Sequence, residues 1–286
     1  MGNSFAALLA AWKKGGAGRA PTVMGIVNVT PDSFSDGGLF LDADVATEHG
    51  VKLAEEGAAI LDIGGESTRG NAVAVPPDEE MRRVLPVIER LRPLSALISI
   101  DTMKAAVAEA AIAAGAHIVN DIRGLQGDPE LPAVAARHRA GVIAMHNPGL
   151  LGSAKPIPGD PVAACLAFFE RSLDIAHRAG IAEDRIVLDP GFGFGKSPEQ
   201  NLELLARFSE LNALGFPVLA GTSRKSFIAK VTGRDTPGRL IGTLVTNVVA
   251  ALAGAAIIRV HDVAEHVDAL RMAAAIRGAG MAWAPA

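Results

Sequence analysis

Polar and charged side chains follow eight apolar runs of this sequence, at positions where a purely structural strand would not need them. They are Asn28; Asp62, Glu66, Ser67, Thr68 and Arg69; Asp101; Asn120 and Asp121; His146; Asp189; Ser223, Arg224, Lys225 and Ser226; and Arg259 and His261. One such residue alone is commonly a helix cap or a turn former. Eight groups in succession predict a shared site of carboxylates, amides and cations. The sequence shows no convincing Ser-His-Asp or Cys-His set, so we expect chemistry without a nucleophilic side chain.

The eight apolar runs are short and rich in Val, Ile and Leu, and each is followed by a stretch of helical period. The runs cover residues 22–29, 58–65, 96–102, 116–122, 141–146, 185–191, 216–222 and 255–261; the helical stretches cover residues 45–57, 78–91, 103–115, 129–138, 161–180, 198–211, 238–254 and 262–276. This alternation predicts an α/β fold, a single (β/α)8 barrel of the TIM type, in preference to an open doubly wound sheet. The carboxyl ends of all strands in such a barrel meet on one face, which carries the active site.

We expect the barrel to occupy residues 21–278, between an N-terminal extension (1–20) and a C-terminal tail (279–286). The extension contains FAALLAAWKKGG, which predicts a short helix. Its charges follow the apolar part, the reverse of a secretory signal. A second apolar stretch, residues 240–258, is interrupted by Gly242, Thr243 and Asn247, which favours a buried helix running into a strand over a membrane span. We therefore expect a soluble, cytoplasmic protein that makes no membrane contact.

Composition and spacing argue against several other kinds of site. The 27 basic and 31 acidic residues give a net charge of -4 with no Lys/Arg-rich run, so nucleic acid is not an expected partner. The single cysteine, Cys165, lies in an apolar stretch and is predicted to be a buried core thiol, which excludes disulfides and thiolate metal sites. The string GFGFGKS (191–197) resembles a phosphate-binding loop, but Pro190 stands where its first glycine is required.

Eight strings of this sequence, taken in order, resemble the dihydropteroate synthases of bacterial folate biosynthesis, a pterin-binding family. They are GIVNVTPDSFSDGG, DIGGESTR, SIDT, NDIRG, MH, LDPGFGFGKS, TSRKSF and RVHDV, and the likeness extends from Thr22 to Ile276. The resemblance implies a transferase that condenses 6-hydroxymethyl-7,8-dihydropterin pyrophosphate with p-aminobenzoate to give 7,8-dihydropteroate and pyrophosphate. It also implies Mg²⁺ as the metal, inhibition by sulfonamides, and a homodimer formed through the late helices.

The resemblance assigns roles to several of the strand-end residues. Asp101, Asn120 and Asp189 would hold the polar edge of the pterin, and Lys225 would reach its carbonyl side. A reduced pterin presents ring N–H, amino and carbonyl groups, so carboxylates, an amide and a cation suit it. Arg259 would lie on the ring face and, with His261, meet the pyrophosphate, because a guanidinium is planar and permanently charged. The expected catalytic residues are Asp101, Lys225, Arg259, His261 and Arg69.

The loop NVTPDSFSDGG (28–38) would close over this site. Asn28 offers a neutral oxygen to Mg²⁺, which keeps most of its waters and bridges to substrate phosphates. The residues implied at the p-aminobenzoate and pyrophosphate side are Asp32, Phe34, Asp36, Thr68, Arg69, Ser226 and His261. Pyrophosphate would leave with its charge neutralised by Mg²⁺, Arg69, Arg259 and His261.

Four residues keep two interpretations each. Asp62 either contacts ligand or supports a Gly-Gly turn, and Asp121 either contacts ligand or orients Arg123. Ser226 is a p-aminobenzoate contact, the N-cap of a helix, or both. His146 is followed by Asn147 where the family more often has methionine, which leaves its contribution open. For the whole chain, a methyltetrahydrofolate-binding methyltransferase domain and a non-catalytic pterin-binding protein are the alternatives, but neither needs Arg69, Arg259 and His261.

One departure from the family pattern lies in the second loop. Where the family continues ESTR with Pro-Gly-Ala, this chain has Gly70-Asn71-Ala72. Proline fixes φ, whereas glycine adds conformational freedom. We expect a more mobile loop and weaker sulfonamide inhibition than in relatives with the proline; the alternative is that Asn71 and its neighbours restore the loop shape.

Overall fold

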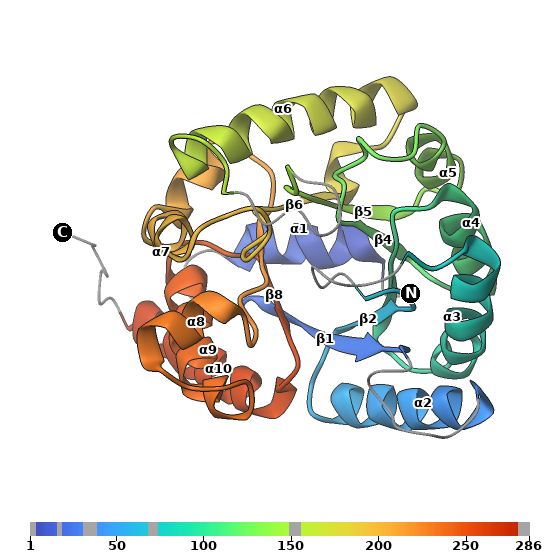
Figure 1. The fold of residues 1–286 in the computed structure, drawn as a ribbon, viewed down its shortest axis with the longest axis horizontal. Helices are drawn as coiled ribbons and strands as arrows, with labels where there is room; N and C mark the ends of the chain where they lie inside the picture. The colour runs from blue at the N-terminus through green and yellow to red at the C-terminus, as the bar shows by residue number, and fades with distance from the viewer. Residues whose placement is uncertain (1–3, 16–18, 31–38, 68–73, 149–155, 280–286) are drawn as a thin grey trace.

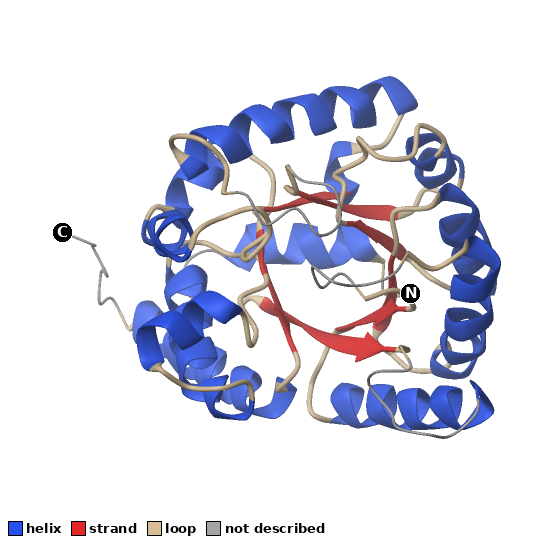
Figure 2. Ribbon diagram, viewed as in Figure 1, coloured by secondary structure: helices blue, strands red, loops and turns tan. Residues whose placement is uncertain are grey.

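The computed structural model describes residues 4–15, 19–30, 39–67, 74–148 and 156–279, and within them eight parallel strands form one sheet. The sheet order is β6-β5-β4-β3-β2-β1-β8-β7, and a parallel bridge between Leu188 and Val218 brings β6 beside β7. Helices surround this ring of strands on the outside (Figures 1 and 2). The predicted (β/α)8 barrel is therefore confirmed.

The strands have the following bounds: β1 Thr22–Asn28, β2 Ile60–Gly64, β3 Leu97–Asp101, β4 Ile118–Asp121, β5 Gly141–Met145, β6 Ile186–Asp189, β7 Leu219–Ala220 and β8 Ile257–Val260. The helices are α1 Phe5–Gly15, α2 Leu39–Glu55, α3 Pro77–Leu91, α4 Ala105–Ala114, α5 Leu131–Arg137, α6 Pro161–Ala179, α7 Pro198–Ala206, α8 Ser226–Thr232, α9 Leu240–Leu252 and α10 Val263–Gly278, with 3-10 turns η3 Glu183–Arg185, η4 Phe208–Leu214 and η5 Pro237–Arg239.

Two parts of the helical pattern differ from the sequence-based expectation. α2 begins at Leu39, six residues before the predicted start. Between β7 and β8 the chain forms α8 and α9 rather than one helix, because Gly233 ends α8 in a left-handed conformation (φ 67°). The stretch 240–258 divides into α9 and β8, as predicted. Among the described residues no helix combines the length and apolar character needed to cross a membrane.

The N-terminal helix α1 closes one end of the barrel. Its Phe5 and Leu9 are buried against inward-facing side chains near the start of the strands. The contact is close, since a Cβ added at Gly141 would lie 2.2 Å from Cδ1 of Phe5. In Figure 1, α1 runs across the far end of the ring of strands. Apolar side chains therefore fill the end of the barrel where the strands begin, and a polar site can form only at the end where the strands finish.

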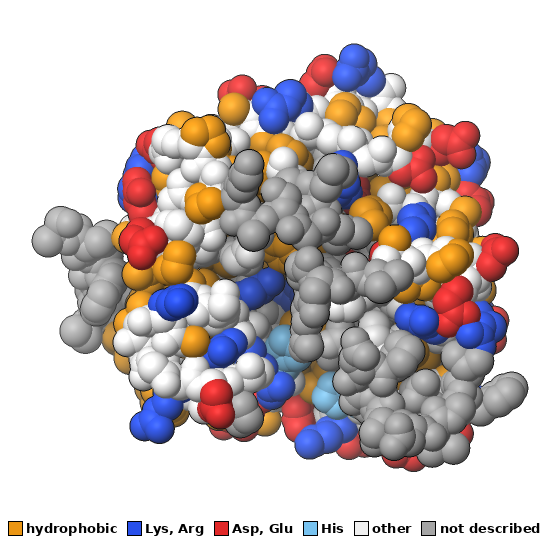
Figure 3. All heavy atoms as spheres, in the orientation of Figure 1, with side chains coloured by type: hydrophobic (Ala, Val, Ile, Leu, Met, Phe, Trp, Pro, Cys, Tyr) orange, Lys and Arg blue, Asp and Glu red, His pale blue; other side chains and the backbone are white. Residues whose placement is uncertain are grey.

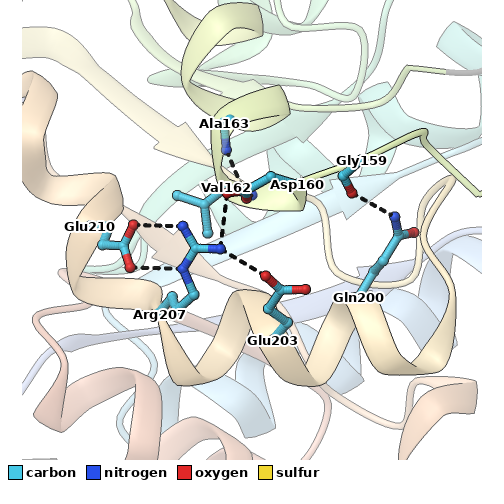
Figure 4. A network of polar contacts seen from close by, with 8 residues as sticks. All are labelled: Gly159, Asp160, Val162, Ala163, Gln200, Glu203, Arg207 and Glu210. Atoms are coloured by element: carbon cyan, nitrogen blue, oxygen red, sulfur yellow. Dashed lines mark hydrogen bonds and ion pairs between the residues drawn. The ribbon is translucent and has the colours of Figure 1, made fainter.

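A network of charges joins α6 to α7 on the outside of the barrel (Figure 4). Asp160 caps α6 by accepting hydrogen bonds from the amides of Val162 and Ala163. Arg207, which follows α7, pairs with Asp160 at 3.1 Å, with Glu203 at 2.7 Å and with Glu210 at 2.8 Å. These contacts hold α7, and with it the loop that precedes α7, against the start of α6.

The start of α7 provides a stability prediction. Ser197 and Gln200 form a capping box in which the Ser197 hydroxyl accepts from the Gln200 amide and the Gln200 side chain accepts from the Ser197 amide. Ser197→Ala removes one half of this box and is expected to lower the free energy of unfolding by about 0.5–2 kcal/mol. Urea unfolding would measure the loss, with Ser197→Thr as the control that keeps a capping hydroxyl. An unchanged urea midpoint for Ser197→Ala would contradict the capping role.

Candidate active site

Side chains that point into the barrel form an apolar layer and, above it, a polar one. The apolar layer contains Met24, Ile60, Leu97, Ile118, Ile143, Val187, Leu219 and Ile257. Because side chains two residues apart share a face of a strand, the next layer contains Ile26, Asp62, Ser99, Asn120, Met145, Asp189, Gly221 and Arg259. The barrel interior therefore changes from apolar to polar side chains within one step of two residues. The polar side chains of this layer, together with Asp101 two residues beyond Ser99, are called the floor of the site.

Arg259 organises the floor of this site. Its Nε donates to Oδ2 of Asp62 at 2.6 Å, and its Nη2 donates to Oδ2 of Asp101 at 2.7 Å. Nδ2 of Asn120 also donates to Asp62 Oδ2, at 3.0 Å. The three residues come from β2, β3 and β4, while Arg259 comes from β8, so the network spans the barrel. Burial raises the pKa of Asp101, and the negative charge of Asp62 adds to that rise while Arg259 opposes it.

Three buried polar atoms of the floor have no hydrogen-bond partner among the described residues: Asp62 Oδ1, Asn120 Oδ1 and Ser99 Oγ. A buried polar atom without a partner costs about 1–3 kcal/mol, so these atoms need water or a polar ligand beside them. Two of them are acceptors only, which matches a ligand that presents N–H groups. The floor is thus built to receive hydrogen-bond donors.

Asp189 and Lys225 form the other side of the site. Oδ1 of Asp189 accepts from the Gly191 amide at 2.7 Å, which fixes the carboxylate, and burial raises its pKa. Nζ of Lys225 lies 4.1 Å from the centre of the Phe194 ring. Burial and then repulsion from Arg259 lower the pKa of Lys225 to about 8. The carboxylate of Asp189 and the ammonium of Lys225 are close enough to affect each other's pKa, but they form no direct ion pair in the structure.

Ser223 and His261 lie where β7 and β8 end. Oγ of Ser223 is 2.8 Å from Nδ1 of His261 and accepts from the His261 amide at 3.2 Å. Burial, followed by the nearby charges of Arg224 and Arg259, lowers the pKa of His261 to about 3, so the ring is neutral at pH 7. Arg224 has φ 58°, an unusual conformation for a residue with a Cβ, and it separates Ser223 from Lys225. Figure 3 shows basic and histidine side chains gathered on this face, toward the α8 side.

The GFGFGKS string forms a loop between β6 and α7. Nζ of Lys196 lies 3.0 Å from the carbonyl oxygens of Gly191 and Phe194 and 2.9 Å from Nδ1 of His146. Gly191 has φ 64°, and a Cβ there would lie 2.2 Å from the His146 carbonyl oxygen. Lys196 is therefore turned inward to brace the loop that supports Asp189 and Phe194.

Comparison with known proteins identifies this arrangement. The family model described as "Pterin binding enzyme" matches residues 24–261. The dihydropteroate synthase of Synechocystis sp. is 45% identical over 264 residues, which are 91% of this chain and 91% of that protein. The chain belongs to the dihydropteroate synthase family. Membership favours a synthase over the methyltransferase and non-catalytic alternatives.

Solved structures of family members superimpose closely on the chain. The Xanthomonas albilineans dihydropteroate synthase with 4-aminobenzoic acid is 48% identical, with a TM-score of 0.86 over 91% of this chain and 94% of that one. The Yersinia pestis dihydropteroate synthase in complex with a sulfonamide drug is 44% identical, with a TM-score of 0.85 over 91% and 95% of the two chains. The fold of this chain is therefore the fold on which dihydropteroate synthases bind these ligands.

The structure brings together some of the residues that the sequence predicted for the site. Asp101, Asn120, Asp189, Lys225, Arg259 and His261 all lie at the polar end of the barrel. Ser226 is the first residue of α8 and is exposed; Lys225, not Ser226, occupies the N-cap position, so the capping interpretation of Ser226 was wrong. The predicted residues Asp32, Phe34, Asp36, Thr68 and Arg69, with Gly70 and Asn71, lie outside the described residues.

The structure also places the residues whose roles the sequence left open. Asp62 is fully buried in the floor, where it holds Arg259 and Asn120. Asp121 points to the other face of β4 and accepts from the amides of Arg123 (2.8 Å) and Leu125 (2.7 Å), so it shapes a turn. His146 contacts Lys196 and the Phe168 ring, 4.9 Å between ring centres, outside the floor.

Sequence reasoning missed Ser99. The signal was present, because Ser99 is a polar residue at the inward-facing position two residues before Asp101 in a strand that is otherwise apolar. A search for polar residues at strand ends does not find Ser99, because it lies in the middle of β3.

Proposed function

We propose that this chain condenses 6-hydroxymethyl-7,8-dihydropterin pyrophosphate with p-aminobenzoate, releasing pyrophosphate. The observation that carries the proposal is the floor in which Arg259, Asp62, Asp101 and Asn120 form one network with unpaired acceptor atoms facing inward, in a chain of this family. A reduced pterin has the ring N–H and amino donors that such acceptors require.

The residues divide the work by their chemistry. Asp189 and Asn120 accept hydrogen bonds from the pterin edge, and Lys225 donates to its carbonyl oxygen. Burial lowers the pKa of Arg259, but the negative charges of Asp62 and Asp101 raise it by more, so Arg259 stays charged at every working pH. The charged guanidinium stabilises the leaving pyrophosphate. Burial lowers the pKa of His261 to about 3, so the ring is neutral before substrate binds, and the negative charge of the pyrophosphate would raise that pKa on binding.

The reaction needs no protein nucleophile, because pyrophosphate leaves with the electron pair of its bond to the pterin methylene carbon and the arylamine nitrogen of p-aminobenzoate captures the resulting pterin cation. The proton that the arylamine loses passes to pyrophosphate or water. Cys165 is not suited to act as a nucleophile, because it is buried and burial raises the pKa of its thiol to about 12. Its predicted place in the core is confirmed. Rate acceleration then comes from orientation of the two substrates and from stabilisation of the departing charge.

The residues present fit a Mg²⁺ ion that is held mainly by substrate and water. The described residues contain no group of three or more His, Cys, Asp and Glu side chains that could hold a metal ion. Asn28, at the exposed end of β1, offers one neutral oxygen beside the site. When bound there with the substrate's phosphates, Mg²⁺ would supply charge neutralisation for the leaving group.

This assignment predicts the behaviour of an Asn28→Ala variant. The variant is expected to need more Mg²⁺ to bind the pterin pyrophosphate, while a pterin without the pyrophosphate binds as before, because only the phosphates share the metal with Asn28. Calorimetric titrations of both ligands over a range of Mg²⁺ concentrations would test this. An unchanged Mg²⁺ dependence in the variant would remove Asn28 from the metal site.

The same proposal includes a homodimer in the cytoplasm. Five exposed apolar side chains lie on α8, α9 and α10: Val231, Ile241, Val245, Met272 and Ile276. Between 48% and 70% of each residue is exposed, which favours burial against a second copy of these late helices.

The proposal also keeps the predicted division of the chain, with residues 21–278 as the barrel, residues 1–20 as the N-terminal extension and residues 279–286 as the C-terminal tail.

Product analysis tests the proposed reaction. With isotopically labelled p-aminobenzoate, Mg²⁺ and the pterin pyrophosphate, mass spectrometry is expected to find the label in 7,8-dihydropteroate. If methyltetrahydrofolate binds and the labelled product does not form, the proposal is wrong.

A further inference from the structure

Helix α9 carries three polar side chains on its buried face, although the rest of the helix is apolar apart from Gly242. Thr243, Thr246 and Asn247 are 0%, 9% and 0% exposed. Residues three and four positions apart share one face of a helix, so the three side chains point in the same direction. Apolar side chains would fill these positions without needing partners, so the partners of the polar atoms indicate what this face does.

Two of these side chains hold the beginning of the turn that follows β7. The turn covers residues 222–225 and is closed by the Lys225 amide, which donates to the Thr222 carbonyl oxygen at 3.1 Å. Oγ1 of Thr222 donates to Oδ1 of Asn247 at 2.7 Å and lies 2.8 Å from Oγ1 of Thr246. The first residue of the turn is therefore bound to α9 through its side chain.

The third side chain, Thr243, holds the turn at Arg224. The Arg224 amide donates to Oγ1 of Thr243 at 3.1 Å, and this hydroxyl donates in turn to the Arg239 carbonyl oxygen at 2.9 Å. Nη1 of Arg239 donates to the Arg224 carbonyl oxygen, also at 2.9 Å. Both backbone polar groups of Arg224 are thus held from the start of α9. This matters because Arg224 has φ 58°, which is unfavourable for a residue with a Cβ and needs support from its surroundings.

The conformation of Arg224 decides where two residues of the candidate site lie. Ser223, directly before it, contacts His261, and Lys225, directly after it, reaches the Phe194 ring. A change of φ at Arg224 would rotate Lys225 relative to Ser223. The contacts from α9 therefore set the direction in which the Lys225 side chain points.

The helix that provides these contacts is itself closely packed. A Cβ added at Gly242 would lie 2.4 Å from Cγ2 of Ile228, so α9 and α8 are in direct contact there. Nδ2 of Asn247 is buried without a partner among the described residues, which is a cost that an apolar side chain would avoid. A polar face kept at such a cost fits a requirement for one defined geometry better than a contribution to stability.

We propose that Thr243 and Arg239 are positioning residues, which act through the backbone of Arg224 to hold Lys225 in place for the pterin. The inference rests on the proposed function, in which Lys225 donates to the pterin carbonyl oxygen. Thr243 is fully buried, so it acts on the ligand only through Arg224 and Lys225.

The test compares Thr243→Val with Thr243→Ser and with the matched control Thr47→Val. Valine keeps the shape of threonine without the hydroxyl, and serine keeps the hydroxyl. Thr47 donates to the Ala43 carbonyl oxygen at 2.7 Å within α2, so its variant loses the same kind of intrahelical bond in another helix. At pH 7, Thr243→Val is expected to raise the Kd of a pterin lacking the pyrophosphate roughly three- to tenfold, the range for losing a neutral hydrogen bond. The two other variants should bind as wild type does.

The pH profile separates positioning from a general loss of structure. Burial lowers the pKa of Lys225 to about 8, so wild-type affinity for the pterin should fall between pH 7 and pH 9 as the ammonium loses its proton. This fall should be smaller in Thr243→Val, because the ammonium no longer faces the carbonyl oxygen. The variants leave unchanged the charged groups that act on Lys225, which are Arg259, Asp189, Asp101 and Lys196.

Arg239→Met provides a second variant at a partly exposed position and decides the matter if Thr243→Val does not fold. It removes the hydrogen bond to the Arg224 carbonyl oxygen, so it should weaken pterin binding and flatten the pH profile in the same way. If wild type binds the pterin and the folded variants keep its Kd within about twofold, or weaken binding by the same factor at both pH values, the positioning role is wrong. If wild type binds no pterin, the proposed function fails and this inference fails with it.

Discussion

Replacing Asp189 or Lys225 by alanine is expected to weaken pterin binding at least tenfold. Asp189 is fixed by the Gly191 amide, and Lys225 is held over the Phe194 ring, so both side chains are placed before the ligand arrives. The loss of a hydrogen bond to a charged group costs about 1.5–3 kcal/mol, which is roughly 10- to 150-fold in affinity. Calorimetry at pH 7 with a pterin lacking the pyrophosphate would measure it.

The pH dependence separates the role of Lys225 from a general effect of the substitution. The pKa of Lys225 is about 8 in the free protein, and a carbonyl oxygen that accepts from the ammonium raises that pKa on binding. The affinity of the wild-type protein for the pterin should therefore fall as pH rises through 8. The affinity of Lys225→Arg should not change over the same pH range, because arginine stays charged. Lys230→Ala, on the exposed side of α8, is the control. Near-normal affinity in Lys225→Ala would remove Lys225 from the site.

The second large effect is expected for Asp62→Asn. Oδ2 of Asp62 accepts from both Arg259 Nε and Asn120 Nδ2, and an asparagine keeps one oxygen acceptor but loses the negative charge. Arg259 would then have Asp101 as its one charged partner in the network. We expect kcat/KM for the pterin pyrophosphate to fall roughly 10- to 150-fold, the range for losing a hydrogen bond to a charged group.

Asp121→Asn is the matched control for that experiment. Asp121 is also a buried carboxylate, at the end of β4, which β3 separates from β2. It accepts hydrogen bonds from backbone amides on the outer face of β4. This variant should lose stability in urea while the folded enzyme keeps its kcat/KM. If Asp62→Asn retains kcat/KM within twofold of wild type, the floor does not orient Arg259 as described.

The comparison of Asp62 with Asp121 also shows what the sequence could and could not predict. Apolar runs alternating with helical stretches were enough to predict the barrel and to place the polar residues at one end of it. Which face of its strand a carboxylate occupies depends on register, and Asn120 and Asp121 alternate between the floor and the outside. A sequence that ends a strand in Asn-Asp does not say which of the two points inward.

Residues that act through tertiary contacts were the hardest to predict. Lys104, directly before α4, donates to Glu66 and Glu80, which lie 38 and 24 positions earlier in the chain, so its position in the sequence does not indicate these contacts. His146 stood at a strand end like the site residues, yet Lys196, from the loop after β6, holds it outside the floor. The extra helix α8 was missed because the sequence of seven residues is too short for a helical period to be recognised.

The most direct test of this account is a measurement of pyrophosphate release by the purified protein. With Mg²⁺ present, release is expected only when the pterin pyrophosphate and p-aminobenzoate are both supplied, in a one-to-one ratio with 7,8-dihydropteroate. Omission of either substrate should reduce release to background. Release that does not depend on p-aminobenzoate, or no release with both substrates, would contradict the central claim.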